Sequence, residues 1–268
     1  MYLCTMQSKQ SAVQIAFESL KNAFDTGKAI SPVRELIGDT DIDTAYAVQE
    51  KLIEYFESQG ARKVGIKIGL TAESVQKQLG VNQPDFGVLF AHTHLPNNGE
   101  IPFAFLMQPK AEAEMAFVLK ETISSPIADI AELISKVDYV SPAIEIVGSR
   151  VENWNIKITD TVADNASASH FVLGDTKLNA EALDFENAKM TLTQNGNIAS
   201  EGMAKACMGN PLNAVLWLCN TFIQRGVEVK KGEIILSGAL GPMVPIQAGD
   251  TFKAEIEGLG EVGFSVSL

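Results

Sequence analysis

Two glutamates stand two residues apart in the segment PKAEAEMAFVLK (residues 109–120), which otherwise has the apolar composition of a β-strand. Alternate side chains of a strand share one face, so the carboxylates of Glu112 and Glu114 would lie about 7 Å apart along the strand, within reach of one cation. If they were buried without a cation, mutual repulsion and desolvation would raise the pKa of at least one of them. An exposed acidic strand face explains the same spacing.

A third carboxylate, Glu145, stands between Ile144 and Ile146 in the segment SPAIEIVGSR. An acid in so apolar a strand is unusual for an ordinary surface residue. Three oxygen ligands without a His or Cys partner favour Mg²⁺ or Mn²⁺ over zinc. The residues alone leave two interpretations open, a divalent-metal site and a solvated acidic face.

Four other patterns resemble functional motifs less closely. GLGEVG (258–263) has dinucleotide-loop spacing, but the chain ends five residues later in a strand pattern, which favours a hairpin turn. The segment 39–50 imitates a calcium loop but lacks its central glycine, and Asp43 instead suits a helix N-cap. His92 and His94 have no third ligand at zinc spacing, which favours a solvated turn. Without a G-x-S-x-G elbow, a hydrolase triad is not supported.

The elements that must position these acids fall into two classes. The first sixty residues have helical periodicity in two segments, 11–27 and 41–60, each ending in glycine. From residue 62 the pattern changes to short β-rich runs broken by Gly and Pro. We therefore expect an α+β fold, with an N-terminal helical segment (1–61) and one compact β-roll catalytic unit (62–268).

Three local features punctuate the β-rich part. A helix is expected near residues 127–136, and another over 210–226, where Pro211 suits the first turn and Gly226 follows the end. Asn195-Gly196, between two alternating runs, predicts a β-hairpin.

The composition restricts the partners. The formal net charge is −12, from 21 basic and 33 acidic residues, which argues against nucleic acid and against anionic membranes as partners. An anionic substrate would need a local cation or a metal ion. Cys4, Cys207 and Cys219 form no C-x-x-C pair and are expected to be reduced thiols. With no basic-then-apolar leader and no apolar run of about 20 residues, we expect a cytoplasmic protein.

Six segments together carry a family resemblance. They occur in the order GIKIGLT (65–71), GVNQPDFGVLF (80–90), PKAEAEMAFVL (109–119), AIEIVGSR (143–150), DTVADNAS (160–167) and SGALGPMVPIQAGD (237–250). In this order they resemble the 2-keto-4-pentenoate hydratases of bacterial aromatic-ring catabolism, within the fumarylacetoacetate hydrolase superfamily. The resemblance covers residues 41 to 268. It implies a mixed β-roll of the superfamily's C-terminal-domain type, preceded by a helical segment.

The resemblance also implies a set of site residues. The family's Mg²⁺ or Mn²⁺ ligands fall on Glu112, Glu114 and Glu145, and its acid/base and substrate-positioning residues fall on Lys67 and Asp85. Four further positions match residues that line the family's pocket: Lys157, Ser167, Ser237 and Gly238. Two positions depart from the family pattern: Asn210 replaces a histidine of several relatives, and the segment LFAHTH differs from the acidic pattern expected there.

The implied activity is the hydration of 2-hydroxypenta-2,4-dienoate, a small anionic dienoate, to 4-hydroxy-2-oxopentanoate. The resemblance further implies a homo-oligomer, with a pentamer as one expected state, and pairing with a paralogous decarboxylase. Three alternatives stay open: a 2-oxo-3-enedioate (4-oxalocrotonate) decarboxylase, a non-catalytic partner subunit of that enzyme, and an acylpyruvate hydrolase. Asp85 and the segment SGALGPMVP favour the hydratase, and the absence of an evident His/Glu dyad disfavours the hydrolase.

Overall fold

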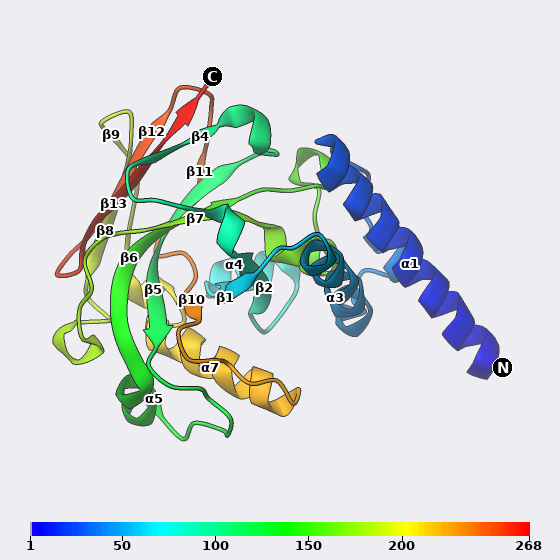
Figure 1. The fold of residues 1–268 in the computed structure, drawn as a ribbon, viewed down its shortest axis with the longest axis horizontal. Coiled ribbons are helices and arrows are strands. Elements are labelled where there is room, and N and C mark those ends of the chain that lie inside the picture. The colour runs from blue at the N-terminus through cyan, green and yellow to red at the C-terminus, as the bar shows by residue number, and fades with distance from the viewer. Residues whose placement is uncertain (1) are drawn as a thin grey trace.

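The computed structural model describes the backbone of residues 2–268 and the side chains of residues 9–77 and 80–268 (Figure 1). The Cys4 side chain is not among those described. Cys207 and Cys219 are buried, free thiols. The α-helices are α1 (Tyr2–Thr26), α2 (Arg34–Ile37), α3 (Ile42–Ser58), α4 (Glu73–Leu79), α5 (Ile130–Lys136), α6 (Ile158–Ala163) and α7 (Pro211–Gln224). None of these helices combines the length and the apolar character needed to cross a membrane.

The strands form two sheets, both of them mixed. The larger sheet has the order β2-β1-β10-β5-β6-β7-β3, with β11 also paired to β5. Its strands are β1 (Lys63–Gly69), β2 (Asp85–Phe90), β3 (His94–Leu95), β5 (Lys110–Leu119), β6 (Val137–Val147), β7 (Ala168–Leu173), β10 (Ile234–Leu236) and β11 (Val244–Pro245). Two pairs, β1–β10 and β3–β7, are parallel.

The smaller sheet has the order β4-β13-β12-β8-β9. Its strands are β4 (Gly99–Pro102), β8 (Lys189–Gln194), β9 (Asn197–Met203), β12 (Thr251–Ile256) and β13 (Gly260–Ser267). In this sheet β4 and β13 are parallel and the other pairs are antiparallel. The predicted α+β fold with a mixed, rolled sheet is confirmed.

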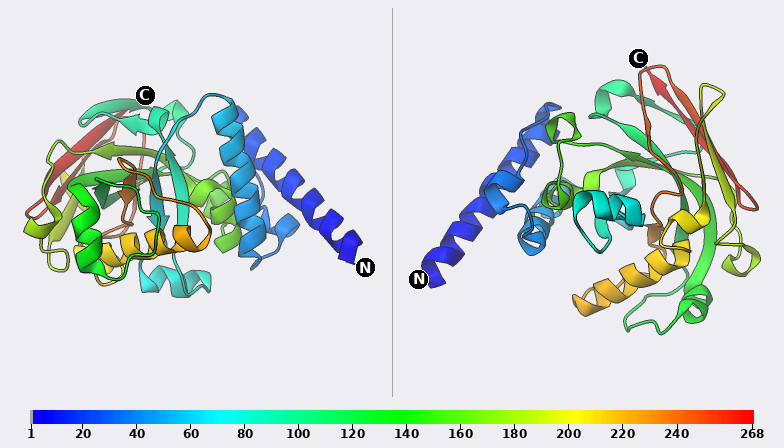
Figure 2. Two further views of the ribbon diagram at one scale, coloured as in Figure 1. Left: turned by 60° about the horizontal axis from the view of Figure 1, so that its bottom comes forward. Right: turned by 180° about the vertical axis from the view of Figure 1, so that it is seen from behind.

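One apolar core joins the helical segment to both sheets. A continuous cluster of buried side chains includes Leu20 and Tyr46 from the helices, Ile66 and Ile144 from the larger sheet and Phe264 from the smaller one. Figures 1 and 2 show α1 and α3 on the opposite side of the molecule from β12 and β13. The helices therefore pack into the same core as the strands, and the domain division at residue 61 stays a prediction.

The hairpin and the helix after Asn210 are confirmed, whereas two helix starts differ: α1 begins at Tyr2, before the predicted segment 11–27, and the N-cap of α3 is a different aspartate. Asn195-Gly196 joins β8 to β9, and α7 begins at Pro211 with the Asn210 side chain accepting a hydrogen bond from an amide of its first turn. The N-cap of α3, however, is Asp41 and not Asp43. The Asp41 carboxylate accepts the Thr44 N–H, so Asp43 already lies in the first turn, where the helix dipole favours a negative charge.

Candidate active site

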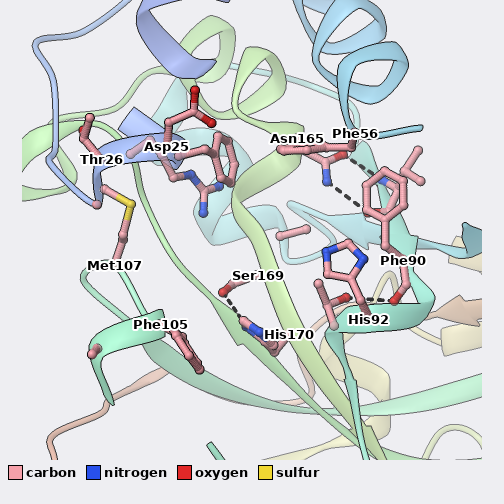
Figure 3. Close-up of a pocket in the computed structure, with 17 residues that line it drawn as sticks. Asp25, Thr26, Phe56, Phe90, His92, Phe105, Met107, Asn165, Ser169 and His170 are labelled. Atoms are coloured by element: carbon pink, nitrogen blue, oxygen red, sulfur yellow. Dashed lines mark hydrogen bonds between the residues drawn. The ribbon is translucent and has the colours of Figure 1, made fainter. Parts of the chain in front are cut away.

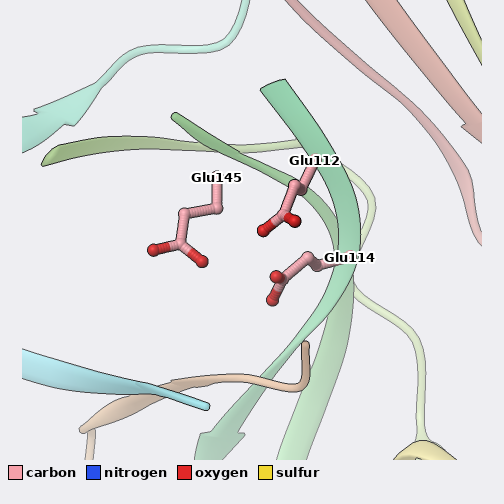
Figure 4. A group of neighbouring side chains, drawn as sticks. All are labelled: Glu112, Glu114 and Glu145. Atoms are coloured by element: carbon pink, nitrogen blue, oxygen red, sulfur yellow. The ribbon is translucent and has the colours of Figure 1, made fainter. Parts of the chain in front are cut away.

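The register of β5 and β6 brings the three glutamates together. Glu112 lies directly opposite Glu145 in this antiparallel pair, and Glu114 lies opposite Ala143. Because side chains alternate between faces, all three carboxylates project from the same face of the sheet. Figure 4 shows them converging on one point, and carboxylate oxygens from the three residues lie within 4.8 Å of one another.

Three of the six carboxylate oxygens are buried and lack a hydrogen-bond partner among the described residues. Glu114 and Glu145 are completely buried, whereas Glu112 is partly exposed. Among the described residues, Glu114 Oε1 and both Glu145 oxygens have no hydrogen bond. Buried charged oxygens in a folded protein are normally paired or bound to a metal. An all-oxygen donor set with unused lone pairs fits a hard divalent cation such as Mg²⁺ or Mn²⁺.

The remaining Glu114 oxygen is held by a turn after β10. Glu114 Oε2 accepts the Gly238 N–H at 2.8 Å. Gly238 has a φ of 103°, and a Cβ there would lie 2.4 Å from the Thr71 hydroxyl, so only glycine suits this turn. The turn thereby aims a backbone amide at a carboxylate, which fixes the orientation of Glu114.

Burial raises the pKa of all three carboxyl groups when no cation is present. For Glu145, desolvation is the main cause, and the pKa rises to about 7 although Lys67 opposes the shift. Desolvation also raises the pKa of Glu114 well above its usual range, and the neighbouring Glu145 and Glu112 add to the effect. The pKa of Glu112 is raised as well, again mainly by burial. Holding three ionised carboxylates here therefore requires positive charge.

Lys67 on β1 supplies one such charge. Its ammonium lies 3.3 Å from Glu145 Oε2 and donates a 3.0 Å hydrogen bond to the Ala166 carbonyl. Burial by itself would lower the Lys67 pKa, but Glu145, Asp85 and the other two glutamates outweigh it, so the net shift is upward. Lys67 is therefore a buried cation.

Asp85 is the first residue of β2, the strand that pairs with β1. Gly69 of β1 is its register partner. Its carboxyl group is 2% exposed, Oδ1 has no hydrogen-bond partner among the described residues, and burial raises its pKa. The structure thus brings Lys67 and Asp85 together beside the carboxylates.

These groups open into a cavity of about 510 Å³. Lys67, Asp85 and Glu112 line it, together with Thr161 and Ser167. The rest of the lining is mainly apolar and includes Leu70, Val75, Val147, Trp154, Ile156 and Met243. Lys67 is the single basic residue in the described lining. The cavity therefore offers two carboxyl groups, those of Glu112 and Asp85, one ammonium and a largely apolar surround.

The other predicted pocket residues are placed differently. Ser167 lines the cavity and shares a 3.0 Å hydrogen bond with Thr161. The Ser237 hydroxyl accepts the Met115 N–H and donates to the Gly238 carbonyl, so it is occupied by the backbone. The Lys157 side chain is half exposed and pairs with Asp39, which does not line the cavity. These roles in substrate binding stay predictions.

Two features were missed from the sequence. The first is the turn at Asn165, Ala166 and Ser167, in which three consecutive residues have φ between 50° and 58°. Left-handed backbone costs an L-residue about 1–2 kcal/mol, and no glycine marks this turn in the sequence. The only feature of the sequence that pointed to this turn was its position inside the segment DTVADNAS, one of the six segments that carry the family resemblance.

The second is another cavity of about 510 Å³ beside the helical segment (Figure 3). Phe56 of α3, Phe90 of β2 and His170 of β7 line it, and so does Asn165. Burial lowers the pKa of His170 to about 4, and His92 and Arg150 add to this shift. Since Ala166 and Ser167 line the first cavity, the turn 165–167 borders both.

Known proteins resemble the chain over nearly its whole length. The family described as fumarylacetoacetate (FAA) hydrolase C-terminal matches residues 59–267. The TodF product hydratase of Pseudomonas putida F1 is 47% identical, with 95% of both chains covered. The 2-keto-4-pentenoate hydratase of Paraburkholderia xenovorans LB400 is 46% identical over 96% of this chain and 94% of its own.

A solved structure agrees in fold. The 4-oxalocrotonate decarboxylase of Pseudomonas putida G7, in complex with magnesium and adipate, superposes with a TM-score of 0.91 at 30% identity, covering 96% of this chain and 98% of its own. The family match covers more than half of the chain, and the curated relatives are similar from end to end. The chain therefore belongs to the fumarylacetoacetate hydrolase family.

Proposed function

We propose that the protein is a metal-dependent hydro-lyase that hydrates 2-hydroxypenta-2,4-dienoate (2-keto-4-pentenoate) to 4-hydroxy-2-oxopentanoate. The observation that carries the proposal is the convergence of three carboxylates, two of them fully buried and with unpaired oxygens, on one point beside a cavity lined by Glu112, Lys67 and Asp85. The names of relatives 46–47% identical to the chain support the same reaction.

Glu112, Glu114 and Glu145 would hold the cation, Mg²⁺ or Mn²⁺. When bound, a divalent ion would polarise the oxygens of a 2-oxo acid as a Lewis acid. The neighbouring decarboxylase structure was solved with magnesium, which supports this type of ion. Gly238 keeps Glu114 oriented for the task, since its amide occupies the oxygen that faces the turn.

Lys67 is suited to binding negative charge and not to accepting a proton. Its pKa is shifted upward, so it is an ammonium at neutral pH. The Lys67 ammonium donates one hydrogen bond to the Ala166 carbonyl and forms an ion pair with Glu145. Its remaining donor capacity is available to the anionic substrate, whose charge would otherwise be buried among carboxylates.

Asp85 is our candidate for proton transfer. Burial raises its pKa, which is the direction that favours a general acid. The acid would deliver its proton to the terminal carbon, C5, while the enol O–H releases its proton to solvent, which gives the α,β-unsaturated ketone. The resulting carboxylate would then accept a proton from the water that adds at C4, while C3 takes one proton back from solvent, so that no net proton is gained or lost. Each step leaves Asp85 ready for the next one.

The alternative is the 4-oxalocrotonate decarboxylase, whose substrate carries a second carboxylate. Lys67 is the single basic residue in the described lining, and Leu70, Val75 and Met243 offer no charge to a distal carboxylate. Lys110 lies 4.1 Å from the Trp154 ring centre, outside that lining. A short, uncharged diene end fits this cavity better than a dicarboxylate does.

The proposal extends to the protein's assembly and location. We propose that the protein forms a homo-oligomer, with a pentamer as one expected state, and that it pairs with a decarboxylase. Only the family likeness supports these two proposals. A cytoplasmic location is supported by the buried free thiols of Cys207 and Cys219.

The test is a two-substrate assay on chelator-treated protein reloaded with Mg²⁺ or Mn²⁺. We expect loss of the dienoate ultraviolet absorbance without CO₂ release, and little turnover of 4-oxalocrotonate. Faster release of CO₂ from 4-oxalocrotonate would establish the decarboxylase instead. Full hydratase activity under continued chelation would exclude a metal requirement. If this protein turned over neither substrate but raised the activity of an added decarboxylase, it would instead be a supporting subunit of that enzyme.

A further inference from the structure

The left-handed turn at residues 165–167 is bonded to strand β2 through the Asn165 side chain. Asn165 accepts the Val88 N–H through Oδ1 at 2.7 Å and donates from Nδ2 to the Val88 carbonyl at 2.9 Å (Figure 3). An asparagine side chain thereby pairs with the backbone of β2 as a neighbouring strand would. This paired contact ties the turn to β2, in addition to the bond from the Gly148 N–H to the Ser167 carbonyl.

The tie lies next to Lys67. Val88 is the register partner of Ile66 in β1, and Lys67 is the partner of Gly87. A Cβ at Gly87 would lie 2.3 Å from the Asn165 carbonyl oxygen, so the absence of a side chain there lets the turn approach the strand. The approach places the Ala166 carbonyl 3.0 Å from the Lys67 ammonium.

From this geometry we infer that Asn165 is a positioning residue for Lys67, acting through the Ala166 carbonyl. The role of Lys67 toward the substrate rests on the proposed function. The chain of contacts runs from Val88 through the Asn165 amide to the Ala166 oxygen and on to the ammonium. Asn165 itself lines the other cavity, so it acts on the reaction without touching the substrate.

The test variant is Asn165→Gly, because glycine retains the positive φ while the clamp is lost. A misplacement of about 1 Å at a reacting group lowers turnover by on the order of 100-fold. We therefore expect kcat to fall about 100-fold and KM to rise because the displaced ammonium binds the anionic substrate less well, with bound Mg²⁺ little changed because the three glutamates stay in place. A parallel loss of metal would contradict the inference, since it would indicate general disruption of the site.

Asn195→Gly is the matched control. Asn195 also has a left-handed backbone, with φ of 53°, and its side chain also bonds the backbone, accepting the Thr251 N–H at 2.9 Å. It lies in the β8–β9 hairpin of the smaller sheet. We expect the two variants to lose similar thermal stability while only Asn165→Gly loses turnover. Equal losses of turnover would overturn the inference.

A double-mutant cycle with Lys67→Met separates positioning from a merely structural role. If Asn165 acts through Lys67, the Asn165→Gly change should alter kcat no more than about twofold in the Lys67→Met background. The same fold loss in both backgrounds would show that the effect does not pass through Lys67.

A crystal structure of Asn165→Gly gives a readout that does not depend on turnover. We expect the Lys67 ammonium to have left the Ala166 oxygen while β5 and β6 are unchanged. An undisplaced ammonium would overturn the inference. Failure of the wild type to hydrate the dienoate would overturn the proposed function and leave this structural result to decide on Asn165.

Discussion

Two pairs of glutamates face each other across antiparallel strands, one pair in each sheet. Glu112 opposes Glu145 between β5 and β6, and Glu255 opposes Glu261 between β12 and β13. Glu255 and Glu261 are exposed, and Lys253 pairs with Glu261 at the surface. Glu145 is fully buried, and its two oxygens have no hydrogen bond among the described residues.

The two pairs differ in burial and in the positive charge around them. Like charges directly opposite each other are unfavourable in any sheet, but water and Lys253 screen the exposed pair. The buried pair has lost that screening, and the desolvation of a charge costs several kcal/mol. One ammonium, that of Lys67, faces Glu112, Glu114 and Glu145 together. The negative charge of the three carboxylates exceeds the charge of this one ammonium, and a bound cation would compensate the difference.

The largest expected effect separates the two pairs directly. Glu145→Gln should lose its bound Mg²⁺ or Mn²⁺ and at least about 10³-fold in kcat, since a Lewis acid contributes several kcal/mol to such a reaction. Glu261→Gln, the matched change in the exposed pair, should keep both. Metal content after dialysis and turnover of the dienoate measure the two effects. A Glu145→Gln protein with full metal content would remove Glu145 from the ligand set.

Next in size are the changes at the two residues beside the carboxylates. Asp85→Asn keeps the shape of the side chain but removes the proton transfer, which should cost about 10²–10⁴-fold in kcat. Lys67→Met should also lower turnover strongly, with a rise in KM because the anionic substrate loses its ammonium partner. Steady-state kinetics at saturating metal measure both. Turnover of Asp85→Asn at the wild-type rate would show that another group moves the proton.

The buried pair should also change how metal-free protein responds to pH. Burial raises the folded-state pKa of Glu145 to about 7, so the folded protein binds more protons than the unfolded chain between about pH 4.5 and 7. Stability from this group is therefore present at low pH and is lost as the pH rises through that window, by up to about 3 kcal/mol. Metal-free Glu145→Gln should accordingly be more stable than metal-free wild type at pH 7.5, and the gap should close toward pH 5.

The variant must be compared with the wild type at each pH. Burial lowers the pKa of His170 to about 4, so its contribution runs in the opposite direction, with stability rising as the pH increases over the same range. The difference between the two melting curves cancels this contribution. Saturating Mg²⁺ should reverse the order of stability at pH 7.5, because only the wild type binds the ion tightly. A constant difference between pH 5 and 7.5 would contradict the coupling.

The sequence predicted most of the acidic site because its signals are local. The two-residue period places Glu112 and Glu114 on one face, and the apolar neighbours of Glu145 mark it as buried. Neither signal distinguishes Glu112–Glu145 from Glu255–Glu261, because register and burial depend on strands far apart in the chain. The residues alone left a metal site and a solvated acidic face both open, and the family resemblance is what favoured the metal site at Glu112, Glu114 and Glu145.

The parts that sequence reasoning missed depend on long-range contacts. Asn165 bonds Val88, 77 residues away, and Ala166 meets Lys67 across 99 residues. Their left-handed backbone has no glycine to announce it, so the tertiary contacts must impose it. The start of α3 was misplaced for a simpler reason, because Asp41 and Asp43 are equally good N-caps by residue type.

The smallest effect is expected at the exposed lysine that the resemblance assigned to the substrate pocket. Lys157 is half exposed and pairs with Asp39, and such surface pairs contribute only about 0–1 kcal/mol to stability. Lys157→Met should therefore leave kcat and KM within about twofold of wild type, since lost surface charge acts weakly through water. Lys67→Met is the buried counterpart and should be strongly impaired. A several-fold rise in KM in Lys157→Met would mean that the Lys157 side chain leaves Asp39 and contacts the substrate. The expectation that an exposed charge matters less than a buried one would then be wrong at this position.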